Sequence, residues 1–136
     1  MAITRLSTAT CGDCANAIKS RIDAGAGPGL IRVYDGALPA TPETAITVQV
    51  LLGTLTLSDP CGTVTDKTLN FAAIAQDIAA DTNGVIGFCR VTDSNGNVIV
   101  DGDASTVLGT GMFKFNTTTV VAGGPIAMTS GSITVG

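Results

Sequence analysis

Apolar and small residues recur at the three- and four-residue spacing of a helix in one part of the chain, near its N-terminus. They are Cys11, Cys14, Ala15, Ile18 and Ile22. The spacing predicts an amphipathic helix over residues 7–24. Its N-cap is expected to be Ser7, Thr8 or Thr10, because a hydroxyl oxygen can accept a hydrogen bond from a first-turn N–H. The Gly-Ala-Gly-Pro-Gly run at residues 25–29 ends the helix and is expected to act as a hinge.

From residue 30 onward the apolar period changes to two, which is the period of half-buried strands. The expected strands are residues 30–35, 46–57 (one strand, or two joined at Gly53), 85–92, 97–101, 112–116, 118–121, 126–129 and 132–135. The Asp-Ser-Asn-Gly turn at residues 93–96 makes the clearest hairpin, because Asn-Gly suits a tight turn with positive φ. Residues 69–81 fit a helix face and a strand face equally well.

Seven or eight short strands with regular turn signals are typical of a β-sandwich or barrel. The fold class predicted here is mainly β: an antiparallel β-sandwich, jelly-roll-like, with one N-terminal helix. The domain division follows the change of period. Residues 1–29 form the N-terminal helix and Gly-rich hinge, and residues 30–136 form the β-sandwich.

The composition indicates a surface with few charges. The chain of 136 residues is 45% hydrophobic but only 13% charged and 4% aromatic, whereas about a quarter of an average domain is charged. Its 20 Thr and 7 Ser supply neutral polar groups instead, and Thr suits a half-exposed strand. The net charge is −4, which disfavours nucleic acid and anionic membranes as partners.

Charge is divided unevenly along the chain. Residues 1–32 hold four cations and two acids, a net +2, and the remaining residues hold three cations and nine acids, a net −6. The longest apolar stretch, residues 48–57, is too short and too interrupted to span a bilayer. No apolar run of signal-peptide length opens the sequence, so synthesis and retention in a cytoplasm are expected.

No residue combination indicates catalysis. The chain has no His, which excludes Ser-His-Asp and Cys-His nucleophiles and His-containing metal sites. Cys11 and Cys14 form the only close cysteine pair, whereas a structural zinc site usually brings two pairs, and they are interpreted as small residues on the buried helix face. Cys61 and Cys89 could form a disulfide if adjacent. We therefore expect no enzyme, no metal and no cofactor.

Several segments resemble a family of small virion proteins of tailed bacteriophages. The segments are residues 1–10 (MAITRLSTAT), 16–18 (NAI), 22–27 (IDAGAG), 31–36 (IRVYDG), 39–42 (PATP), 52–60 (LGTLTLSDP) and 88–97 (FCRVTDSNGN). These segments are typical of strands and turns, and they occur in the same order as in that family. They therefore indicate a fold family rather than an activity. The four cysteines are not part of the pattern.

The resemblance implies a cement or decoration protein on the head of the phage. Such a protein stabilises the capsid by bridging major capsid subunits, as a dimer or trimer, on the capsid surface of a virion assembled in the host cytoplasm. A tail, neck or fibre component of the same virion is the alternative. The residues expected to contact the capsid or a neighbouring copy lie in the positive N-terminal segment: Arg5, Ile18, Lys19, Arg21, Ile22 and Arg32.

Overall fold

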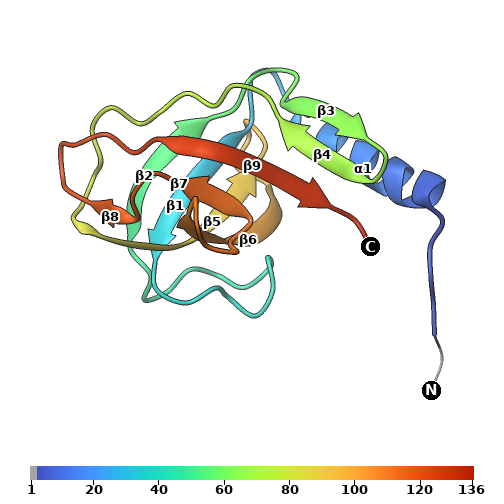
Figure 1. The fold of residues 1–136 in the computed structure, drawn as a ribbon. Helices are drawn as coiled ribbons and strands as arrows, with labels where there is room; N and C mark the ends of the chain where they lie inside the picture. The colour runs from blue at the N-terminus through green and yellow to red at the C-terminus, as the bar shows by residue number, and fades with distance from the viewer. Residues whose placement is uncertain (1–2) are drawn as a thin grey trace.

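The computed structural model describes residues 3–136, within which it contains one helix and nine short strands (Figure 1). These elements are α1 (Thr8–Ile22), β1 (Leu30–Asp35), β2 (Leu51–Thr56), β3 (Gly62–Thr65), β4 (Thr68–Phe71), β5 (Gly84–Thr92), β6 (Val98–Thr106), β7 (Phe113–Phe115), β8 (Thr119–Val120) and β9 (Met128–Thr134). The prediction of a mainly β protein with one helix is confirmed.

Helix α1 begins where the sequence predicts. Ser7 is the N-cap, and its hydroxyl accepts a hydrogen bond from the Thr10 N–H at 3.1 Å. The helix lies beside the β3–β4 hairpin, at the opposite end of the molecule from β8 (Figure 1). Ile22 is fully buried in the same apolar core as the strands, and Ile18 packs against that core. The proposed domain division at residue 29 stays a prediction, but the helix is packed onto the body.

The strands follow the order β2-β1-β5-β6-β7-β9-β4-β3, and β8 pairs with β5. All of the pairs are antiparallel except β6–β7, which is parallel, so the prediction of an antiparallel fold is wrong. The pair is parallel because residues 107–112 return to the level of Ala104 before β7 begins, so that Ala104 lies opposite Phe113. The return path is close, since a Cβ on Gly111 would come within 2.6 Å of the Ala104 carbonyl carbon. A jelly-roll sandwich is not confirmed, because the strands form one curled, mixed sheet.

The ambiguous stretch at residues 69–81 is neither a helix nor one strand. After β4 it becomes an irregular extended segment that joins the two ends of the sheet. Ala75 and Thr56 exchange backbone hydrogen bonds on the β2 side, and Asp77 and Ile126 do so on the side leading to β9. The carboxylate of Asp77 also accepts from the Thr54 N–H at 3.0 Å. The segment therefore closes the curl of the sheet.

The core lies inside this closed curl. It is built from alternate residues of the strands, and its largest members are Phe113, Phe115, Ile22, Ile31, Leu52, Leu55 and Leu69. The predicted strands agree best with the structure at β1, which occupies the expected residues 30–35, and at β5 and β6, which form the expected hairpin. The two strands expected at 126–129 and 132–135 are the single β9, and β3 was not foreseen.

The turn of the β5–β6 hairpin is organised by Asp93. One carboxylate oxygen accepts from the backbone N–H groups of Asn95 and Asn97, and the other accepts from the Asn97 side-chain amide, all at 2.9 Å. Gly96 has the positive φ (90°) that Asn-Gly predicts. These hydrogen bonds, above all that from the Asn97 side chain, lower the pKa of Asp93 below its ordinary value.

Shortening Ile22 is expected to cost stability, because its side chain fills a space between the helix and the sheet. We expect Ile22→Ala to lower the free energy of unfolding by about 2–5 kcal/mol, measured by urea denaturation. Ile78 is 75% exposed, so Ile78→Ala is the matched control and should change stability little. Equal effects of the two substitutions would contradict the packing of α1 into the core.

Stability should also depend on the ionisation of Asp93. Because the pKa of Asp93 is lowered in the folded protein, its charged form stabilises the fold above the ordinary carboxyl pKa. That contribution is lost as the pH falls through the lower folded-state pKa. Unfolding measured between about pH 7 and pH 2 should show a flatter acid limb for Asp93→Asn than for the wild type. Asp13→Asn, on the exposed helix surface, should leave the limb unchanged.

Candidate interaction surface

A long loop, residues 36–50, connects β1 to β2 and contains no helix or strand. Loops of this length in compact domains are usually functional or disordered. This loop is tied at its base: the Val50 N–H donates to the Asp35 carboxylate at 2.6 Å, and the Gln49 amide donates to the Ala37 carbonyl at 2.8 Å. Figure 1 shows it projecting below the sheet. We call it the β1–β2 loop.

The middle of the β1–β2 loop is held by a buried ion pair. Arg90 of β5 donates to both carboxylate oxygens of Asp101 on β6, at 2.7 and 2.8 Å, and to the Thr44 carbonyl of the loop at 3.0 Å. Both side chains are about 95% buried. The hydrogen bonds to Asp101 raise the pKa of Arg90 above its ordinary value. The guanidinium therefore remains charged, and all three of its nitrogens are engaged in fixing the loop to the sheet.

The anchored loop presents apolar side chains to solvent. Leu38, Val48 and Val50 are 48%, 84% and 42% exposed. Branched apolar side chains on an ordered segment bury area on contact without the entropic cost of ordering a mobile loop. Exposed apolar groups that gather in this way are typical of protein interaction sites.

Arg32 of β1 lies next to this anchor. It pairs in register with Arg90 on one side and with Thr54 on the other. Asp101 is engaged by Arg90, and the buried Nε of Arg32 has no hydrogen-bond partner within residues 3–136. Arg90 therefore has a carboxylate partner, whereas the neighbouring Arg32 forms no ion pair within residues 3–136.

A hollow of about 430 Å³ adjoins the loop. It brings together α1, the loop and the beginning of β6, and its lining residues are Ala17, Ile18, Arg21, Glu43, Val98 and Ile99. Arg21 is exposed at the C-terminal end of the helix. Ile18, Arg21 and Arg32, three of the six contact residues predicted from sequence, therefore lie beside the β1–β2 loop.

The other three predicted contact residues lie elsewhere. Arg5 is exposed on residues 3–7, which precede α1 and which we call the N-terminal arm. Lys19 forms a 3.2 Å ion pair with Asp23, one turn along the helix. Ile22 is fully buried within its own chain. The six residues do not form one patch. The sequence analysis did not single out the β1–β2 loop, and its prediction of a strand from residue 46 is wrong, because residues 46–50 belong to the loop and β2 begins at Leu51.

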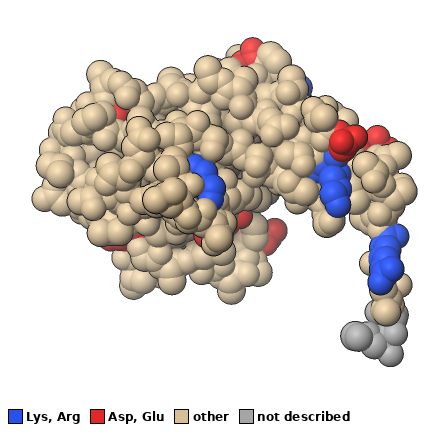
Figure 2. Space-filling view, in the orientation of Figure 1, with Lys and Arg blue, Asp and Glu red and all other residues tan. Residues whose placement is uncertain are grey.

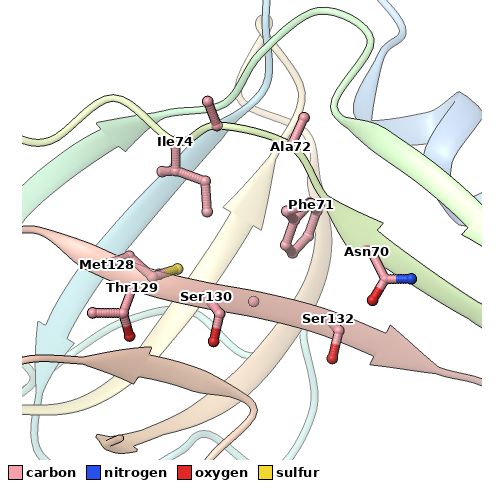
Figure 3. A pocket seen from close by; sticks show the side chains of 10 residues that line it. Asn70, Phe71, Ala72, Ile74, Met128, Thr129, Ser130 and Ser132 are labelled. Atoms are coloured by element: carbon pink, nitrogen blue, oxygen red, sulfur yellow. The ribbon is translucent and has the colours of Figure 1, made fainter.

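A second feature is an open groove of about 700 Å³ between residues 70–74 and β9, which we call the β9 groove (Figure 3). It arises because β4 pairs with β9 only over residues 132–134, and the chain then leaves β9 to reach β2. Along residues 128–131, β9 pairs with β7 on one edge, and no strand described in the structure pairs with the other edge.

The lining of the β9 groove is mixed: three apolar side chains form its floor, and Asn70, Thr129, Ser130 and Ser132 add polar groups. Phe71 and Ile74 point from one wall toward β9, and Met128 lies on the other wall (Figure 3). Phe71 stacks on Phe113 of the core, with 6.2 Å between ring centroids. Gly131 permits this arrangement, because a Cβ there would come within 2.9 Å of the Phe71 ring.

The face seen in Figure 2, in the orientation of Figure 1, carries few charged side chains. Most of the charge visible there lies toward the end of the molecule that holds α1, and a broad neutral area covers the sheet. No Lys, Arg, Asp or Glu lines the β9 groove.

The four cysteines are free thiols, so the disulfide that Cys61 and Cys89 could have formed is absent. Burial, with a contribution from the charge of Asp23, raises the pKa of Cys61 to about 12. Burial also raises the pKa of Cys89. Cys11 is buried and Cys14 is half-buried. A thiol whose pKa is raised by burial is a poor nucleophile at neutral pH.

Comparisons with protein-family models, with curated protein sequences and with solved structures give no match. Within residues 3–136, no three His, Cys, Asp or Glu side chains lie close enough together to hold a metal ion. The helix described here is neither long enough nor apolar enough to cross a membrane.

The cysteines should differ in how fast a thiol reagent modifies them in the native protein. We expect a thiol reagent to modify Cys14 first in the native protein at neutral pH, and Cys61 and Cys89 only after unfolding, because both are buried with raised pKa values. Peptide mass spectrometry after timed labelling, with a denatured sample as control, gives the order. Rapid labelling of Cys61 or Cys89 in the native protein would contradict it.

Proposed function

We propose that this protein is a structural component of a tailed-phage virion that attaches to the outside of the capsid and stabilises it by bridging major capsid subunits. The observation that carries the proposal is the β1–β2 loop, an ordered loop that exposes Leu38, Val48 and Val50. The sequence resemblance to small phage virion proteins supplies the class of partner. The protein would act by binding alone, and a small free energy at each site adds up over a shell with many copies.

In the proposed contact, apolar side chains hold the complex together and charged side chains steer its association. Burying the exposed loop side chains would hold the protein on the shell, since each fully buried Leu or Val contributes about 1.5–3 kcal/mol. Arg21 and Arg32 flank the loop and form no ion pair within residues 3–136. Arg21 is exposed and Arg32 is half-buried, and an exposed cation steers association more than it holds a complex.

Substitution in the loop tests this attachment. Val48→Asp should weaken binding of the purified protein to undecorated capsids by about tenfold or more, because a charge would enter an apolar contact. Val121→Asp is the matched control, since Val121 is 63% exposed and lies beyond β8, and it should bind as the wild type does. Both variants should keep the wild-type melting temperature. Equal binding by Val48→Asp and the wild type would overturn the role of the loop.

The salt dependence of capsid binding distinguishes electrostatic steering of association from apolar attachment. Raising the salt concentration should slow the binding of free protein to undecorated capsids but leave decorated particles intact. Complete removal by a salt wash would contradict an apolar contact. A cryo-EM map of the virion tests the location: density on the capsid supports the proposal, and density on the tail, neck or fibres would replace it with the alternative assignment.

A further inference from the structure

We propose that the N-terminal arm of one copy lies in the β9 groove of a second copy, where it adds a short strand to the free edge of β9. The inference concerns assembly of the chain with itself and does not depend on the proposed capsid attachment. It rests on two features of the same chain: residues 3–6, which form no hydrogen bond within residues 3–136, and one edge of β9, which has no strand partner there over residues 128–131.

The first feature is the arm. Residues 3–6 make no hydrogen bond within residues 3–136 and belong to no helix or strand. Ile3 and Leu6 are 72% and 52% exposed. The arm therefore leaves both its backbone groups and two large apolar side chains exposed to water.

The second feature is the groove. An antiparallel strand offers the N–H and C=O groups of every second residue to each neighbour. Over residues 128–131 of β9, the groups on the groove side have no strand partner. Four residues of strand span about 13 Å, which is also the extended length of the four arm residues 3–6. Phe71, Ile74 and Met128 provide an apolar floor beside this edge.

A second copy fits the groove better than the chain's own arm. Ser7 has extended backbone angles (φ −66°, ψ 158°), and its hydroxyl caps α1, which fixes the direction in which the arm leaves the helix. Figure 1 shows the arm leading away from the sheet. To enter its own groove the arm would have to reverse at Ser7 and give up this cap. A neighbouring copy requires no such change.

The strand geometry restricts which arm side chain is buried. Successive side chains of a strand point to opposite faces, so Ile3 and Leu6 cannot both face the groove floor. One of the two substitutions Ile3→Asp and Leu6→Asp should therefore weaken self-association by about tenfold or more, and the other should have a much smaller effect. Leu108→Asp is the matched control, because Leu108 is 94% exposed on the β6–β7 loop.

Two complementary variants test the exchange directly. One lacks residues 3–6 and keeps the groove. The other, Ser130→Trp, keeps the arm and fills the groove from an exposed position, and Ala73→Trp fills it from the opposite wall should Ser130→Trp lower the melting temperature. By sedimentation velocity over about 1–100 μM, the wild type should self-associate and each variant alone should stay monomeric. An equimolar mixture of the two should associate, because one supplies the arm and the other the groove.

A photo-crosslinking residue at position 130 identifies the occupant. In a mixture of isotope-labelled and unlabelled wild-type chains, we expect links from position 130 to residues 3–6 of another copy. A monomeric wild type, association without residues 3–6, equal effects of Ile3→Asp and Leu6→Asp, or links within a single chain would each overturn the proposal. These outcomes are read in solution without capsids, so they are independent of whether the protein binds a shell.

Discussion

Residues 72–81 form backbone hydrogen bonds to β2 on one side and to residues 123–126 on the other, and this double pairing turns an open sheet into a closed curve. An open sheet of this size would expose the inner faces of β1, β2 and β5, where Ile31, Val33 and Leu52 lie fully buried. Closure removes that exposure and leaves fewer free strand edges. The segment can be irregular because each of its two neighbours needs only a few hydrogen bonds from it.

The same closure creates the β9 groove. The chain must leave β9 after Phe71 to reach β2, so β9 loses a partner over residues 128–131 while its apolar neighbours remain in place. The unpaired edge is therefore a consequence of how the sheet is closed. Natural proteins usually cover or charge such an edge, and the residues that line the β9 groove carry no charge. A neutral edge over an apolar floor favours pairing with another extended segment.

The sequence predicted the elements whose signals are local. The N-cap, the β1 strand at residues 30–35 and the turn at residues 93–96 depend on residues close together in the chain. The strand and the turn were predicted, and Ser7 was one of three candidate N-caps. The parallel β6–β7 pair and the closing role of residues 72–81 depend on contacts with distant strands, which periodicity cannot specify. Three of the six candidate contact residues, Ile18, Arg21 and Arg32, lie beside the β1–β2 loop, a location that the sequence did not predict, and the contact role of all six stays a prediction. The Arg90–Asp101 pair was not predicted, although both residues lie on the predicted hairpin, because the register shift at Val91 and Thr92 that places them opposite each other is not visible in the sequence pattern.

The buried Arg90–Asp101 pair matters for what the loop can do rather than for stability alone. Burying two charges carries a desolvation cost that their attraction only partly offsets, so such a pair is weak evidence for a stabilising role. Here Arg90 also donates to the Thr44 carbonyl, which ties an irregular loop of 15 residues, 36–50, to the sheet. A loop without this tie could turn Leu38 and Val48 inward or collapse onto the sheet. Because the guanidinium fixes the middle of the loop, its apolar side chains stay exposed, and an exposed apolar surface held in a fixed geometry is what recognition of another protein requires.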